Sequence, residues 1–131
     1  MHVTLHLVQT IAFPVLTYGI EAIPLNKTQL SSLDHPWSRI FMKIVSTFDQ
    51  NIVQQCQFYS GLLPIRHYYV LRRMRFLFNI ASTNNSLLRL VFEINGRADI
   101  AKLSDIYNCT PDMFKNCFEQ AIKNKFMSEC Y

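Results

Sequence analysis

Glycine, charge and flexible segments are all scarce in this sequence. Its 131 residues include three glycines and five prolines, and charged residues make up 17% of the chain, below the roughly 25% usual in soluble domains. No stretch has the composition of a flexible linker or a low-complexity tract. Half of the residues are hydrophobic, which is enough for one buried core at this length. We therefore expect one compact unit whose weakly charged surface faces a partner or belongs to a larger protein.

The sequence also lacks the patterns of common catalytic and metal centres. It contains no phosphate-binding loop, no G-x-G-x-x-G and no G-x-S-x-G motif. Its aspartates are spread out, so no adjacent pair could hold two magnesium ions. The cysteines include no C-x-x-C pair and are interpreted as buried free thiols. We expect no cofactor, no metal and no catalytic activity of this chain's own. The four cysteines are Cys56, Cys109, Cys117 and Cys130.

The first 20 residues are mostly apolar, yet they fit neither a signal peptide nor a membrane span. They contain no lysine or arginine, and His6, Gln9 and Thr10 interrupt the apolar run. A signal peptide has a basic start, and a spanning helix needs about 20 mostly apolar residues. We therefore expect a buried core helix, an intracellular location in the cytoplasm or nucleus, and no contact with a membrane.

Apolar residues recur with a helical period along the whole chain, and no segment alternates as a strand does. The clearest stripe lies in the helix that Asn26 or Thr28 begins, where it includes Trp37 and Phe41 and runs unbroken across Pro36. The expected fold is all-α, an irregular bundle of about six to seven helices without a sheet. The other expected helices cover residues 2–19 (kinked at Pro14 and closed by Gly19), 50–60, 64–81, 87–94 (ending at Asn95-Gly96), 98–107 and a last one that Thr110 caps.

Positive charge is concentrated in the first two-thirds of the chain. Residues 1–90 hold eight lysines and arginines against three acids, whereas residues 91–131 hold five against six. We interpret the first range as a basic helical region, and the second as a C-terminal tail packed on it or partly independent. The imbalance favours one polyanion-facing side, although a solvated basic surface is the plainer alternative. Arg39 and Lys43 lie on the polar side of the helix that contains Trp37.

The helix expected from residue 64 has the densest cluster of arginines. At 100° per residue, Tyr68, Arg72 and Arg75 share one face, and Arg66 and Arg73 lie on another. Guanidinium groups fit phosphate oxygens, and tyrosine rings can stack on bases or sugars. In the alternative interpretation these arginines lie over aromatic neighbours or pair with acids at the edge of the core.

Four short motifs follow one another with a characteristic order and spacing. A Tyr-Gly-x-Glu turn precedes a Leu-x-x-Leu helix with basic residues, and a Gly-x-x-Pro-Ile break precedes an Arg-Arg-x-Arg helix. Over roughly residues 3–90, this order resembles the region downstream of the polymerase palm in reverse transcriptases of non-LTR (LINE-type) retrotransposons. The motif residues are Tyr18, Gly19 and Glu21, then Leu30, Leu33, Arg39 and Lys43, and finally Gly61, Pro64, Ile65, Arg72, Arg73 and Arg75.

The resemblance implies a thumb and post-thumb helical region in a truncated or remnant polymerase. Its partners would be RNA or an RNA–DNA hybrid, held through phosphates, and the missing palm domain of the parent protein. RNA-directed DNA synthesis would belong to that parent, because the aspartate-pair polymerase box is absent here. The Cys-Cys-His-Cys knuckle of some relatives is absent too. The nucleic-acid-binding residues expected on this basis are Arg39, Lys43, Arg66, Tyr68, Arg72, Arg73 and Arg75.

Two other functions remain open from the sequence. An independent helical protein-interaction module would use the apolar stripes as a binding groove. A small membrane-associated protein would use the apolar N-terminal segment and the basic charge, with a pI near 9.0.

Overall fold

The structure is a computed structural model that describes residues 2–108 and 111–130, with the side chains of residues 3–108 and 120–129. Every regular element in this part of the chain is helical and no strand occurs in it, which confirms the all-α prediction. Short π- and 3-10-helical segments, labelled η, adjoin or link the α-helices. The elements are α1 (His2–Leu7), η1 (Val8–Ala12), α2 (Phe13–Leu16), η2 (Ile20–Ala22), α3 (Lys27–Val45), α4 (Gln50–Ser60), α5 (Ile65–Ala81), α6 (Ser86–Val91), η3 (Phe92–Gly96), α7 (Arg97–Tyr107) and α8 (Pro111–Cys130).

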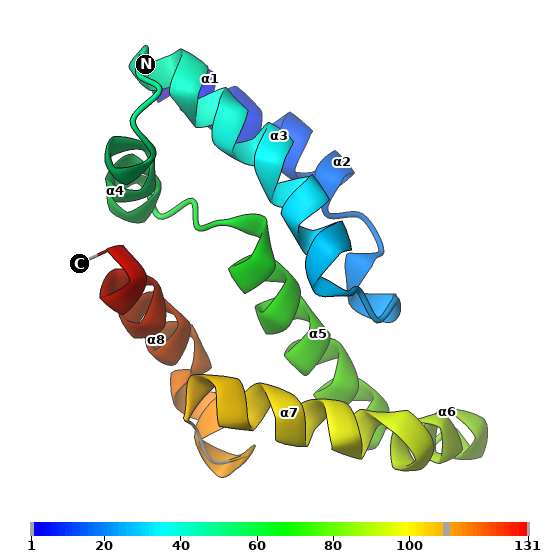
Figure 1. Cartoon of the computed structure of the whole chain (residues 1–131). Coiled ribbons are helices and arrows are strands. Elements are labelled where there is room, and N and C mark those ends of the chain that lie inside the picture. The colour runs from blue at the N-terminus through cyan, green and yellow to red at the C-terminus, as the bar shows by residue number, and fades with distance from the viewer. Residues whose placement is uncertain (1, 109–110, 131) are drawn as a thin grey trace.

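Helix α5 occupies the middle of the arrangement and contacts most of the other elements. Figure 1 shows α3 running back alongside α1 and α2, with α5 packed next to α3. The continuous rod of α6, η3 and α7 crosses one end of α5, and α8 then returns to pack against α4 and α5. Helix α5 thus contacts α3 and η2, which precede it in the chain, as well as α6, η3, α7 and α8, which follow it.

The N-terminal helical segment contains a π-helical turn just before its proline. Pro14 has no N–H to donate to the carbonyl four residues earlier, so one α-helical hydrogen bond is missing there. The π-helical turn is η1, in which the Phe13 N–H donates to the Val8 carbonyl five residues back. The α-helical part ends at Leu16, earlier than the expected residue 19, and Gly19 then turns the chain with a φ of 69°.

The N-terminal segment is buried on one side only, which corrects the expectation of a core helix. Leu5, Val8 and Leu16 pack against the core beneath α3. On the outer side Val3 is 73% exposed and Val15 76% exposed. The segment is therefore an amphipathic surface helix, and no helix among the described residues is long and apolar enough to cross a membrane.

Helix α3 confirms the predicted stripe and the predicted cap. Asn26 and Gln29 form a reciprocal capping box, each side chain bonding the other's backbone N–H at 2.9 Å. The helix continues through Pro36 to Val45. Trp37 and Phe41 are 0% and 1% exposed, and their burial fixes the rotation of α3 about its axis.

The glycine at residue 96 does not end a helix, which corrects the predicted break between residues 94 and 98. Gly96 lies inside the continuous helical rod with helical dihedral angles. A Cβ atom built there would clash with the Phe92 ring. Gly96 therefore leaves room for the Phe92 ring within the π-helical turn. From the sequence alone, a glycine at this position suggests the end of a helix.

The buried side chains form two neighbouring hydrophobic clusters, one on each side of the start of α5. The first lies between α3, α4 and the N-terminal segment, and the second joins α5 to η2, α7 and α8. Buried members of the first cluster are Trp37, Phe41, Val53, Leu62 and Ile65, and those of the second are Ile20, Leu63, Tyr69, Val70, Met74, Ile122 and Phe126.

Candidate nucleic-acid interface

A groove with a volume of about 1010 Å³ runs between α3 and α4 and reaches the first turn of α5. Most of the residues that line it are polar, and three cations and one carboxylate among them give a net charge of +2 with histidine neutral. This groove brings together three of the predicted binding residues from two separate helices. Its charged and ring-bearing side chains are Asp34, His35, Arg39, Lys43, Phe48 and Arg66, and Gln57 contributes a buried amide.

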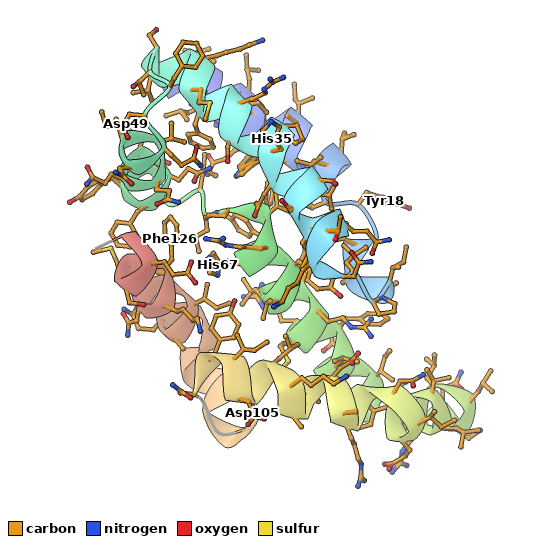
Figure 2. The ribbon with its side chains drawn as sticks, viewed as in Figure 1. Tyr18, His35, Asp49, His67, Asp105 and Phe126 are labelled. Carbon is orange, nitrogen blue, oxygen red and sulfur yellow. The ribbon has the colours of Figure 1, made fainter. Side chains whose placement is uncertain are left out.

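The basic wall of the groove follows from the spacing of residues along α3. His35, Arg39 and Lys43 occur at every fourth position, so each lies about 6 Å further along the helix axis than the last. All three are exposed, because Trp37 is buried on the opposite side of the helix, which faces the core. Figure 2 shows His35 on α3 and Asp49 at the start of α4. Arg39 and Lys43 form no ion pair or hydrogen bond with any residue that the structure describes.

Arg66 reaches the other end of the groove from the first turn of α5. Its side chain is 44% exposed, and its guanidinium group lies 2.8 Å from the carboxylate of Glu129 on α8. An exposed pair of this kind contributes little to stability, because water solvates both groups. Arg66 therefore stays accessible to an anion, although Glu129 offsets part of its charge.

Asp34 on α3 caps the N-terminus of α5. The N-cap position of α5 is Pro64, which has no side-chain acceptor. Asp34 Oδ1 accepts instead from the backbone N–H of Arg66 at 3.4 Å, across the contact between the two helices. Burial raises the pKa of Asp34, and the backbone N–H groups of Ile65 and Arg66 partly oppose that rise. The carboxylate thus holds α5 against α3 at the edge of the groove.

Gln57 lines the groove from α4 and has an unsatisfied amide. The residue is 1% exposed, and its Nε2 has no acceptor within the described part of the chain. Leaving such a buried donor unpaired costs about 1–3 kcal/mol. The backbone holds the residue in place, because the Leu62 N–H donates to the Gln57 carbonyl at 3.0 Å where Gly61 ends α4 with a φ of 71°.

Arg72 and Arg73 do not line the groove and instead bind the corner between α2 and η2. Arg72 Nη1 donates to the Thr17 carbonyl at 2.7 Å and lies 3.7 Å from a carboxylate oxygen of Glu21. Arg73 is 7% exposed, and it donates to the Glu21 carbonyl and to Asp99 Oδ2, each at 2.8 Å. Both arginines are therefore engaged by the protein itself, and Arg73 is withdrawn from solvent.

Tyr68 and Arg75, the remaining predicted binding residues, also lie outside the groove. The Tyr68 hydroxyl donates to the Gly61 carbonyl at 2.9 Å, and its ring packs edge-on against Phe13 with centroids 4.5 Å apart. Arg75 is exposed further along α5. The seven predicted residues therefore separate into a groove set, a corner set and these two individual positions.

A buried histidine between α5, α7 and α8 was not predicted from the sequence. His67 is 2% exposed, and its Nδ1 lies 3.1 Å from the Tyr107 hydroxyl. Figure 2 shows it facing Phe126, and their ring centroids are 5.5 Å apart. Burial, with the nearby cations Arg66 and Lys125, lowers the pKa of His67 to about 4. The ring is therefore neutral at pH 7, and its role is structural.

The electrostatics around this histidine confirm that the ring acts as a neutral hydrogen-bonding group. Arg66 Nε donates to His67 Nε2 at 3.4 Å, so the 3.5 Å approach of Glu129 to the same nitrogen is not an ion pair. Burial, reinforced by Glu129, raises the pKa of Tyr107 to about 12, which keeps its hydroxyl protonated. A signal in the sequence was the spacing of His67, which lies three residues before Val70 and seven before Met74 and so shares their buried helix face.

The cysteines and possible metal ligands add no further site within the described residues. Cys56 is a half-buried free thiol, while the side chains of Cys109, Cys117 and Cys130 lie outside the described part, as does Thr110. No group of three histidine, cysteine or acidic side chains in that part could hold a metal ion.

Comparisons of the chain with protein-family models, with curated proteins and with solved structures found no match.

Proposed function

We propose that this chain is a thumb-like region of a non-LTR retrotransposon reverse transcriptase, and that it binds the phosphate backbone of RNA or of an RNA–DNA hybrid at the groove. The observation that carries the proposal is the convergence of Arg39, Lys43 and Arg66 on one surface. Arg39 and Lys43 are exposed and without partners among the described residues, so they are available for phosphate oxygens. RNA-directed DNA synthesis would belong to the parent polymerase.

The contact between two of the sequence motifs supports the assignment to this family. Arg73 of the Arg-Arg-x-Arg helix donates to the carbonyl of Glu21 in the Tyr-Gly-x-Glu turn, and Arg72 donates to the carbonyl of Thr17 just before that turn. This contact gives a physical reason for the two motifs to occur together, with Glu21 and Arg73 52 residues apart. It also assigns Arg72 and Arg73 a positioning role, and we leave them out of the proposed phosphate-binding surface.

The test is a titration of the purified chain with an RNA–DNA hybrid at several salt concentrations. Each phosphate contact contributes about 0.9 to the slope of log affinity against log salt for a duplex. The double variant Arg39→Gln, Lys43→Gln should therefore reduce this slope by about 2. The matched control is Arg89→Gln, Lys102→Gln, which removes two exposed cations from α6 and α7 and should leave the slope nearly unchanged. Salt-independent or absent binding by the folded chain would overturn the proposal.

A helical protein-interaction module is the second candidate, and the exposed side of the N-terminal segment favours it. Val3, Leu7, Ile11 and Val15 recur at every fourth position and are each at least half exposed. Such a stripe suits packing against another helix. Sedimentation of the wild-type chain and of the variant Ile11→Ser, Val15→Ser separates the candidates. Self-association lost in the variant, without salt-dependent nucleic-acid affinity in either, would favour the module.

A further inference from the structure

We propose that the groove between α3 and α4 receives an unpaired segment of a nucleic-acid strand, with bases held by Phe48 and Gln57. This inference rests on the proposed function and specifies the form of the ligand. A duplex contacts such a surface only through its backbone, whereas a single strand also offers flat base faces and free base edges. The groove contains side chains suited to each of these features.

The first argument is the arrangement of positive charge. Arg39 and Lys43 are one helical turn apart, about 6 Å along the axis of α3. That separation exceeds the roughly 3.4 Å of helix axis per phosphate in one strand of a duplex, and a more extended single strand can span it. A strand lying parallel to α3 could therefore place one phosphate near each cation, and Arg66 stands beyond them at the α5 end of the groove.

The second argument is an exposed aromatic ring at the rim of the groove. Phe48 follows the C-terminus of α3, lines the groove and is 93% exposed. A phenylalanine that is left almost fully in water gains nothing from the hydrophobic effect in the free protein. A base stacked on it would contribute about 1–3 kcal/mol, whatever the sequence of the strand.

The third argument is the unsatisfied amide of Gln57. Its Nε2 is buried, has no acceptor within the described residues, and belongs to a side chain that lines the groove. Glutamine amides match the paired donor and acceptor atoms on the edges of bases. In an A-form duplex the Watson–Crick edges are paired and the major groove is too deep and narrow for side chains, whereas an unpaired base can present a carbonyl or ring nitrogen to this donor.

The size of the groove favours the same conclusion. Its volume of about 1010 Å³ is near the upper end of the roughly 300–1,000 Å³ found for sites that bury small molecules. A few unpaired nucleotides fit that scale. A duplex could rest only on the rim, where it would contact the cations and leave Gln57 without a partner.

The experiment compares fluorescence anisotropy of a labelled octamer as single-stranded RNA, single-stranded DNA and an RNA–DNA hybrid of the same sequence. We expect the single strands to bind the wild-type chain at least about tenfold more tightly than the hybrid. Phe48→Ala should weaken single-strand binding by about 5- to 100-fold, because it removes a stacking platform. The control Tyr59→Ala removes another exposed aromatic, one that does not line the groove, and should have little effect.

Gln57→Leu provides the second variant. It should weaken binding of the single strands severalfold and leave binding of the hybrid unchanged. Equal or tighter binding of the hybrid by the wild-type chain, or equal losses in Phe48→Ala and Tyr59→Ala, would overturn the single-strand inference. Salt-dependent binding of the hybrid would then still support the proposed function, whereas no binding of any of the three probes would overturn both.

Discussion

The guanidinium group of Arg73 joins two distant parts of the chain by donating to the backbone carbonyl of Glu21 and to the carboxylate of Asp99. The two acceptors lie 52 and 26 residues away in the sequence, on η2 and α7. Arg73 thus holds the corner after the N-terminal segment and the rod of α6 and α7 against the same turn of α5. Its position in an arginine-rich helix suggests a ligand contact, but its burial makes it part of the framework.

Arg73→Gln should therefore destabilise the chain without changing its affinity for nucleic acid per folded molecule. Removing one member of a largely buried pair leaves the other without compensation, and we expect a loss of about 2–4 kcal/mol in the free energy of unfolding. Urea denaturation measures the loss, and titration at low urea measures the affinity. Arg89→Gln, on the exposed surface of α6, is the control and should change stability by less than about 0.5 kcal/mol. An unchanged unfolding midpoint in Arg73→Gln would contradict the framework role.

Two phenylalanines seven residues apart should differ in how much stability the chain loses when each is replaced by alanine. Phe41 is 1% exposed in the cluster beneath α3, whereas Phe48 is 93% exposed. Phe41→Ala leaves a cavity and should cost about 3–5 kcal/mol. Phe48→Ala leaves none and should stay within about 0.5 kcal/mol of the wild-type chain. Chemical denaturation monitored by circular dichroism gives both values, and comparable losses would contradict either the burial of Phe41 or the exposure of Phe48.

Stability should fall as the pH is lowered from about 6.5 to 4, because of His67. Its pKa is about 4 in the folded chain and about 6.5 when unfolded, so between these values the unfolded chain binds a proton that the folded chain does not. Stability therefore rises with pH across this window, and the full shift corresponds to about 3 kcal/mol. Urea denaturation at a series of pH values measures the slope. His67→Gln should flatten it, and a slope retained in that variant would assign the effect to other groups.

Asp34 should have separable effects on stability and on binding. Asp34→Ala removes the cap of α5 and should cost about 1–2 kcal/mol. Asp34→Asn keeps an oxygen acceptor for the Arg66 N–H and removes a charge that burial disfavours, so its stability should stay close to that of the wild-type chain. It also raises the net charge of the groove from +2 to +3, and affinity for nucleic acid at low salt should increase. Weaker binding by a folded Asp34→Asn variant would show that the groove does not contact phosphates.

Helix-capping residues and the spacing of apolar residues predicted most of the helices. Asn26 and Gln29 form the expected kind of helix start, and Trp37 and Phe41 mark the buried side of α3 because their spacing matches one helix face. Such signals act over a few residues and need no knowledge of neighbours. The break expected at Gly96 was wrong because the close approach of Phe92, four residues earlier, uses glycine for space.

The candidate site was only partly predictable. Arg66 and Arg73 share a helix face, yet Arg66 is exposed and Arg73 is buried, since different elements pack over successive turns of α5. No periodicity in α5 could reveal that Thr17, Glu21 and Asp99 supply acceptors for its arginines. The groove itself depends on how α3, α4 and α5 meet, so it emerges only from the three-dimensional arrangement.

The cap that Asp34 supplies to α5 has a consequence for how ligand binding and folding are coupled. The first turn of α5 obtains this backbone partner only after α3 has docked, and that same turn carries Arg66 into the groove. The binding surface and the helix contact therefore form together. A ligand that recognises only the assembled groove would stabilise the docked helices by mass action, with a gain that grows with the logarithm of its concentration. Nucleic acid would then act as a folding cofactor for the part of the chain that binds it.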